Sequence, residues 1–172
     1  MPTSQLILVP EIAEVYCRIS PATVLDIGIG FGRNGAIFRE CSDARFGRVK
    51  SADWKTEITG IEIFRDYENP LWGVYNEVII DDAAKFAYGK YDLIFCGDIL
   101  EHLSKGEAMR LLQTLYNRCN KCLMVVLPLG ESVQGAMFGN PAEQHISTWE
   151  AKDFATWNQR LKGNKGLFWK EK

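Results

Sequence analysis

Short apolar runs alternate along the chain with segments in which apolar residues recur every three or four positions. The apolar runs lie at 23–27, 58–63, 77–80, 91–96, 122–127 and 166–170. A continuous apolar run is typical of a strand that is covered on both faces. The alternation of such strands with helical segments predicts βαβ units and a mostly parallel sheet.

The clearest helical pattern spans 107–118, where the apolar side chains fall on one face. Ser104 and Glu107 have the spacing of a capping box, which predicts that a helix begins directly after Ser104. A second Ser-x-x-Glu motif begins at Ser147 and predicts another helix over 151–158. We therefore expect an α/β fold, three-layered and Rossmann-like, with a twisted sheet of about six strands and helices on both faces.

The composition narrows the class of protein. The 172 residues fit a single domain, and with 47% hydrophobic and 24% charged residues they resemble soluble globular proteins. The net charge of -2 gives no basic field for nucleic acid or an anionic membrane, so we expect neither as a partner. No run approaches the roughly 20 apolar residues of a membrane span, and no signal peptide is evident, which favours a cytoplasmic protein.

The five cysteines are an odd number and are scattered, which indicates reduced thiols. Cys119 and Cys122 form a CxxC motif. A structural zinc ion needs four ligands, and no second pair or nearby histidine completes this set, so we expect no metal site.

Acidic residues follow four successive predicted strands. Asp26 lies near the end of the first, Glu62 at the second, Asp81 and Asp82 after the third, and Asp98 after the fourth. Ligands of open parallel sheets bind beyond the carboxyl ends of the strands. Any one of these acids also fits a helix N-cap. Together they favour a ligand with hydroxyl groups, an amine and positive charge.

The loop after the first strand is rich in glycine. Gly30, Gly32 and Gly35 match the GxGxxG pattern of dinucleotide sites, which leaves a nicotinamide-dependent oxidoreductase as one alternative. The strand ends at about Gly28, however, and a GxGxxG motif from there would need glycine where Arg33 stands. A turn that serves only strand-to-helix packing is a further alternative.

These segments together resemble the motifs of class I S-adenosylmethionine-dependent methyltransferases, in that family's order. The matching stretches are VLDIGIGFGRNG at 24–35, TGIEIF at 59–64, EVIIDDAAKF at 77–86, YDLIFCGDILEHL at 91–103 and LMVVLPLG at 123–130. The resemblance implies S-adenosylmethionine as cofactor, a cofactor-binding core over 22–129 and an acceptor-side region over 130–172.

The resemblance also implies a role for individual motif residues. The implied cofactor-binding residues are Asp26, Gly28, Gly30 and Gly32 for the methionine part, Glu62 for the ribose, Ile63, Asp82 and Ala83 for the adenine, and Cys96, Gly97 and Asp98 for the region of the methionyl amine and sulfonium.

The chain departs from the family pattern in two places. Glu62 lies 36 residues after Asp26, where about 20 is usual for the acid on the second strand. We therefore expect an inserted loop at 40–57. The family commonly ends with an antiparallel hairpin, but only the run at 166–170 follows the last predicted helix, which predicts a sheet truncated at that edge.

The two histidines are the candidate catalytic residues. The sequence at 139–141 predicts a turn that presents Glu143 and His145 over the strand ends, and His102 follows Glu101 near the start of a helix. Either imidazole could act as a general base toward an acceptor hydroxyl or amine. Helix capping, loop hydrogen bonding and catalysis by alignment alone are the alternatives.

The leading hypothesis is an enzyme that transfers a methyl group from S-adenosylmethionine to a small-molecule or glycan-like acceptor. The alternative is a non-catalytic S-adenosylmethionine-binding interaction module. As a protein partner we consider a second copy of the chain, in a homodimer. Trp54 and Trp72 fall on predicted loops, where we expect exposed side chains that form a partner or acceptor surface or pack in a lid.

Overall fold

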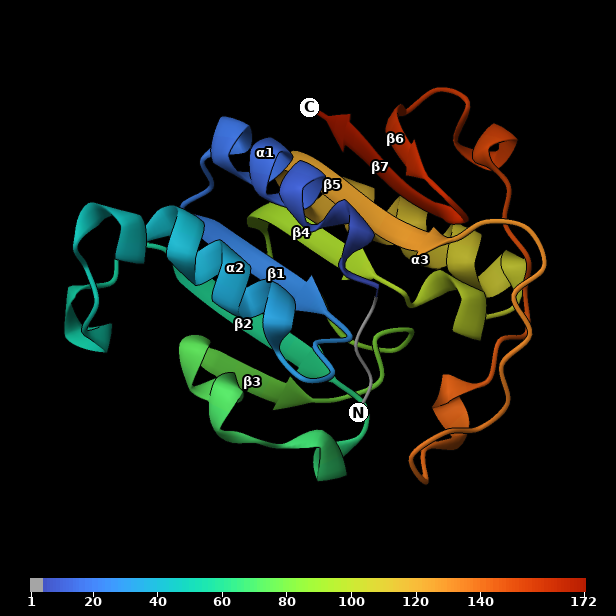
Figure 1. Cartoon of the computed structure of the whole chain (residues 1–172), viewed down its shortest axis with the longest axis horizontal. Coiled ribbons are helices and arrows are strands. Elements are labelled where there is room, and N and C mark those ends of the chain that lie inside the picture. The colour runs from blue at the N-terminus through green and yellow to red at the C-terminus, as the bar shows by residue number, and fades with distance from the viewer. Residues whose placement is uncertain (1–4) are drawn as a thin grey trace.

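The computed structural model describes residues 5–172, which form a mixed sheet of seven strands with helices on both faces (Figure 1). The strands are β1 Thr23–Ile27, β2 Glu57–Glu62, β3 Glu77–Ile80, β4 Tyr91–Gly97, β5 Cys119–Pro128, β6 Asn158–Lys162 and β7 Lys165–Glu171. The α-helices are α1 Val9–Ile19, α2 Arg33–Ser42 and α3 Lys105–Arg118. Short 3-10 helices are η1 Leu6–Leu8, η2 Ala44–Phe46, η3 Ser51–Asp53, η4 Arg65–Tyr67, η5 Pro70–Val74, η6 Leu100–His102, η7 Pro141–Glu143 and η8 Ala151–Phe154.

The strand order is β3-β2-β1-β4-β5-β7-β6. The pairs from β3 to β5 are all parallel, whereas β7 runs antiparallel to both β5 and β6. This confirms the expected α/β fold with a mostly parallel sheet. It also differs from the all-parallel order 3-2-1-4-5-6 of the classical dinucleotide-binding fold, which counts against the oxidoreductase alternative.

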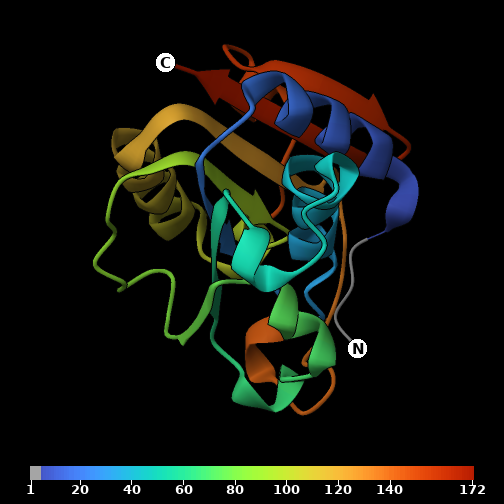
Figure 2. The same ribbon diagram turned by 90° about the vertical axis from the view of Figure 1, so that its left-hand side faces the viewer.

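Two apolar clusters fill the space on either side of the sheet. Leu111 and Leu115 of α3 belong to one cluster, and Ile12 of α1 and Phe38 of α2 belong to the other. Figure 2, in which the side that carries η2 and η3 faces the viewer, places α3 and α2 on opposite faces of the sheet. The helix predicted at 107–118 is confirmed as α3, including its capping box of Ser104 and Glu107.

The prediction for 151–158 was wrong. A single turn, η8, has a capping box of Glu150 and Asp153, and the chain then enters β6. β6 and β7 form the antiparallel hairpin that was expected to be missing. A two-residue turn closes it, and the first residue of this turn is Gly163 with φ 56°. All five residues of β6 are exposed, so an apolar pattern could not detect it.

Of the segment expected as an inserted loop, 40–57, residues 43–56 are irregular chain with two 3-10 turns, while 40–42 belong to α2 and Glu57 begins β2. Its anchor is Arg39, buried on α2, which donates to Asp43 Oδ2 at 2.5 Å and to the Thr56 carbonyl at 2.8 Å. The same guanidinium donates to the Val74 carbonyl at 3.1 Å and lies 3.8 Å from the ring centroid of Trp54. The buried guanidinium therefore helps to hold the segment to the body of the domain.

The CxxC motif does not form a paired site. Cys119 packs in the cluster on the α3 face, and Cys122 packs in the cluster on the opposite face. Both thiols are free and buried. Among residues 5–172, no helix has the length and apolar composition that crossing a membrane requires.

Candidate functional site

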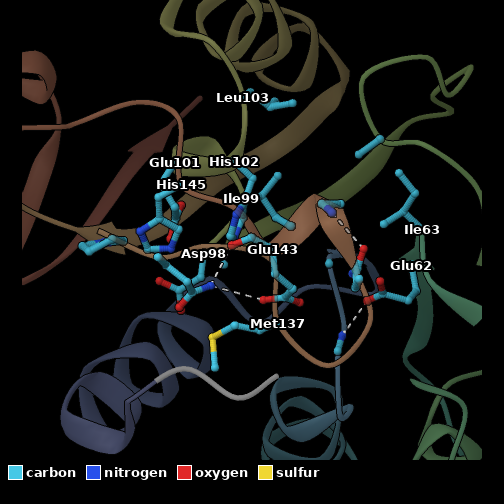
Figure 3. A pocket seen from close by; sticks show the side chains of 18 of the residues that line it. Glu62, Ile63, Asp98, Ile99, Glu101, His102, Leu103, Met137, Glu143 and His145 are labelled. Carbon is cyan, nitrogen blue, oxygen red and sulfur yellow. Dashed lines mark hydrogen bonds between the residues drawn. The ribbon is translucent and has the colours of Figure 1, made fainter. Parts of the chain in front are cut away.

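A cavity of about 390 Å³ opens at the carboxyl ends of β1, β2 and β4 (Figure 3). Small-molecule sites commonly have volumes of about 300–1,000 Å³. The expected site residues that line it are Gly28, Gly30, Glu62, Ile63, Asp82, Ala83, Gly97, Asp98, His102 and His145. Residues that sequence motifs place far apart therefore share one cavity.

Three expected site residues lie behind the cavity wall. Asp26 and Cys96 are buried within β1 and β4, and Gly32 is the N-cap of α2. Burial raises the pKa of Asp26 to about 7, and a hydrogen bond from the Tyr75 hydroxyl to Asp26 Oδ2, 2.7 Å long, opposes that rise. These residues shape the wall instead of lining it.

The glycine turn gives the cavity a wall of backbone. Gly28 has φ 71°, and a Cβ added there would lie 2.0 Å from Ile99 Cδ1. The indole Nε1 of Trp72 donates to the Gly30 carbonyl at 2.8 Å, which fixes the turn from behind. Trp72 is buried, so the expectation of an exposed indole there was wrong, while Trp54 is half-buried.

Glu62 is a buried acid of the cavity, with 5% of its surface exposed. Its Oε2 accepts a hydrogen bond from Gly30 N at 2.8 Å and its Oε1 accepts one from Phe64 N at 3.1 Å. Burial raises the pKa of Glu62, and these backbone donors oppose the rise. Each carboxylate oxygen keeps a second lone pair that can accept from a ligand hydroxyl.

Two of the other acids are already in ion pairs. Asp98 pairs with Lys165 of β7, whose side chain is buried, and Asp98 itself has φ 52°. Asp82 pairs with the exposed Lys85 at 2.7 Å, which lowers the pKa of Asp82. The cavity is therefore less negative than the count of strand-end acids predicts.

The segment after β5 closes over the cavity as expected. Asn140 caps η7 by accepting from Ala142 N at 3.0 Å, which produces the predicted turn. Glu143 Oε1 then accepts from the Tyr67 hydroxyl at 2.8 Å, and the Glu143 carbonyl accepts from Gln134 Nε2 at 2.7 Å. Met137, half-exposed on the same segment, adds an apolar edge to the cavity.

The two histidines lie against each other, with ring centroids 4.9 Å apart. His102 Nδ1 is 3.1 Å from the Gln144 carbonyl, and His145 Nδ1 is 2.6 Å from the Ser132 carbonyl. Burial lowers the pKa of His102, which favours its neutral form. Figure 3 shows both rings beside Glu101, at the end of the cavity away from Glu62 and Ile63.

Sequence reasoning missed three residues of this region. Tyr75 lies on irregular chain after η5, where no periodic pattern marks it, and Lys165 belongs to a hairpin that was not predicted. Glu101 is 2% exposed, and burial, followed by the charge of Asp98, raises its pKa well above the usual range. The adjacent pair Glu101 and His102 was the available signal for this acid.

Comparison with known proteins agrees with the fold. No family model matches the chain. Ubiquinone biosynthesis O-methyltransferase of Paraburkholderia xenovorans (strain LB400) is 28% identical over 96 residues, which are 56% of this chain and 40% of that protein. The chain thus matches less than half the length of this relative.

Solved structures match nearly the whole chain. An O-methyltransferase family protein from Burkholderia thailandensis superposes with a TM-score of 0.69 at 15% identity, covering 96% of this chain and 55% of that one. Magnesium protoporphyrin IX methyltransferase from Synechocystis PCC 6803, solved with bound S-adenosylmethionine, gives 0.62 at 13% identity, covering 95% and 77%.

Proposed function

We propose that this chain is a class I S-adenosylmethionine-dependent methyltransferase. It transfers a methyl group from S-adenosylmethionine to an oxygen atom of a small-molecule or glycan-like acceptor. The observation that carries the proposal is that the Glu62 end and the histidine end belong to one cavity. A cofactor and an acceptor can therefore meet in it.

The Glu62 end fits the nucleoside part of the cofactor. The Glu62 carboxylate is held in place by two backbone N–H donors and retains lone pairs for a ribose diol. Gly28 and Gly30 let a ligand approach the turn without a Cβ in the way. Ile63, with 49% of its surface exposed, offers an apolar face to the adenine, with Asp82 and Ala83 beside it.

The methionine part would lie between the glycine turn and the end of β4. Gly97 and Asp98 line that part of the cavity. Because Lys165 already pairs with Asp98, we assign the recognition of the ammonium group mainly to backbone carbonyl groups there. The bound cofactor supplies a methyl group on a positively charged sulfur atom.

The acceptor would occupy the histidine end. Met137 and Phe138 add apolar surface to the lining of the cavity, which suits an aromatic or other partly apolar acceptor. His102 and His145 each have Nδ1 facing a backbone carbonyl, so Nε2 is the nitrogen that carries a lone pair. An acceptor hydroxyl positioned there would lose its proton more readily. The O-methyltransferases among the similar proteins support oxygen as the acceptor atom.

The test is methyl transfer itself. The protein is incubated with S-adenosylmethionine carrying an isotopically labelled methyl group and with pools of phenols, catechols, alcohols and oligosaccharides, and products are detected by mass spectrometry. We expect the label on an oxygen atom of at least one acceptor class, and a loss of product with His145→Ala. Tight cofactor binding without product across all pools would instead favour the non-catalytic binding module.

A further inference from the structure

We propose that Glu101, His102 and His145 form a binding site for one divalent transition-metal ion at the histidine end of the cavity. One carboxylate oxygen of Glu101 and one ring nitrogen of each histidine lie within 4.8 Å of one another. Figure 3 shows the three side chains gathered there. Metal-to-ligand distances in such sites are about 2.0–2.2 Å, so binding would draw the groups together by roughly 1 Å.

The hydrogen bonds of the imidazoles prepare both rings to act as ligands. A backbone carbonyl can only accept, so the contacts of His102 Nδ1 with Gln144 O and of His145 Nδ1 with Ser132 O place a hydrogen on each Nδ1. Each neutral ring then has its lone pair on Nε2. Metal-binding histidines are commonly oriented in this way, by donating the other ring N–H to a carbonyl or carboxylate.

The carboxyl group of Glu101 also indicates a cation at this position. Its side chain is 2% exposed, and Oε2 has no hydrogen-bond partner among the described residues. An unpaired buried carboxylate oxygen is costly unless a cation or donor meets it. Lys165, which forms its ion pair with Asp98, makes no hydrogen bond to this oxygen. A cation beside Glu101 would resolve the deficit.

The backbone around the three residues is rigid enough to hold a site. Ile146 N and Ser147 N both donate to the Glu101 carbonyl, at 2.8 and 3.1 Å. Ser147 Oγ donates to the Leu100 carbonyl at 3.1 Å and accepts from Trp149 Nε1 at 3.0 Å. The segment that carries His145 is therefore bound directly to the turn that carries Glu101. Such fixed positions favour tight metal binding.

The ligand set indicates the class of ion and the purpose of the site. Two imidazoles with one carboxylate suit zinc, iron, cobalt or nickel better than magnesium or calcium. Three protein ligands leave coordination positions for water or an acceptor oxygen, as in catalytic zinc sites. The use of the ion rests on the proposed function. With both Nε2 lone pairs bound to the ion, the ion would take the place of the imidazoles and favour the ionised form of an acceptor hydroxyl next to it. Binding of the ion does not depend on that function.

The experiment titrates the chelator-treated protein with Zn²⁺ by calorimetry and with Co²⁺ by absorption spectroscopy. We expect one ion per chain and a Co²⁺ spectrum without thiolate charge-transfer bands, because no cysteine belongs to the site. His145→Asn keeps a side-chain N–H donor for the Ser132 carbonyl but removes Nε2, and Glu101→Gln keeps the shape of the acid. Each substitution should weaken metal binding by roughly 10- to 100-fold or more. Removing a group that only hydrogen-bonds to a metal ligand already lowers metal affinity by about this factor.

Glu143→Gln is the matched control, because Glu143 lines the same cavity and lies outside the triad. It should keep native metal affinity. Thermal unfolding of each metal-free variant shows whether it is folded. Added Zn²⁺ should raise the melting temperature of the native chain and of Glu143→Gln more than that of His145→Asn or Glu101→Gln. Absence of binding by the native chain, native affinity in His145→Asn, or equal loss in Glu143→Gln would each overturn the proposal.

The outcomes separate this proposal from the proposed function. Methyl transfer that persists unchanged in the presence of a chelator, with no ion bound, would overturn the metal site and leave the methyltransferase in place. One bound ion per chain without any methyl transfer would support the metal site and contradict the proposed methyltransferase activity.

Discussion

The hydroxyl of Tyr75 donates a 2.7 Å hydrogen bond to Asp26 Oδ2 and accepts a 3.1 Å hydrogen bond from Gly35 N. Tyr75 therefore joins the acid of β1 to the first turn of α2, directly behind the glycine turn. Asp26 Oδ1 has no hydrogen-bond partner among residues 5–172. The tyrosine thus carries much of the stabilisation of this buried carboxyl group.

This arrangement predicts a pH dependence of stability. Burial raises the pKa of Asp26 from 3.8 to about 7, so between these pH values the folded chain keeps a proton that the unfolded chain releases. The contribution of Asp26 to the free energy of unfolding therefore falls as pH rises through this window, by up to about 1.4 kcal/mol per pH unit. Urea unfolding at pH 5, 6, 7 and 8 measures it.

Asp26→Asn is the control for this slope. Its free energy of unfolding should depend less on pH than that of the native chain, so that its stability relative to the native chain improves from pH 5 to pH 8. If the free energy of unfolding has the same pH dependence in the native chain and in Asp26→Asn, the pKa of Asp26 is not raised by the fold.

Tyr75→Phe should lower the free energy of unfolding by about 1–3 kcal/mol, since it leaves the buried Asp26 carboxyl group without its hydrogen-bond donor.

Gly28→Ala should disrupt the glycine turn. The new Cβ would lie 2.0 Å from Ile99 Cδ1, at a backbone φ of 71°. We expect lower stability and loss of cofactor binding, measured by thermal unfolding and calorimetry. Gly28→Ala combined with Ile99→Ala removes the clash and should recover part of the stability, while a cost of about 1–2 kcal/mol for the left-handed backbone remains.

The matched control for that substitution is Gly106→Ala in α3. An added Cβ there meets only Arg110 Nη1 at 3.6 Å. Because alanine is favoured over glycine inside a helix, this variant should be as stable as the native chain or more stable by up to about 1 kcal/mol. Equal damage from both glycine substitutions would contradict a special role for Gly28.

The buried pair of Arg39 and Asp43 should dominate the stability of the inserted segment. Burial raises the pKa of Asp43, but hydrogen bonds from Lys55 N, Arg48 and Arg39 outweigh this and bring it to about 2. Its contribution is therefore complete above pH 4 and is lost as pH falls toward 2. Asp43→Asn should cost about 3–5 kcal/mol at pH 7, because it leaves the buried Arg39 without its anion.

The exposed pair of Arg65 and Glu68, 3.6 Å apart, provides the comparison. Arg65→Ala should change the free energy of unfolding by less than about 1 kcal/mol, since solvent screens such pairs. Denaturant unfolding of both variants measures the difference. A cost for Asp43→Asn as small as that for Arg65→Ala would show that the buried network does not stabilise the fold.

The sequence predicted the part of the fold in which apolar periodicity is strong. The five strands from β1 to β5 were identified from continuous apolar runs, and helix α3 from apolar residues that fall on one face. β6 was missed because its side chains are all solvent-exposed, as is common for an edge strand. The turn at Gly163 and Asn164 was the remaining signal, since two-residue Gly-Asn loops favour hairpins.

The site was predicted to the level of strand ends and no further. Glu62 lines the cavity because parallel strands bring their carboxyl ends together. The histidines were candidates from the turn expected at 139–141 and from the predicted helix start near Glu101, and both line the same cavity. The ion pair of Lys165 with Asp98 depends on the missed hairpin, so the sequence overstated the negative charge of the cavity. The nearness of His145 to Glu101 depends on backbone hydrogen bonds between segments more than 40 residues apart, which no local pattern encodes.

Calorimetry of S-adenosylmethionine binding tests the central claim most directly, with the native chain compared against Glu62→Gln. We predict that the native chain binds one molecule per chain. Glu62→Gln keeps one oxygen acceptor but loses the charge, and should bind roughly 10- to 100-fold more weakly, since a hydrogen bond to a charged group is worth about 1.5–3 kcal/mol. Absence of heat from the native chain with S-adenosylmethionine or its demethylated product, or equal affinity in Glu62→Gln, would contradict the account.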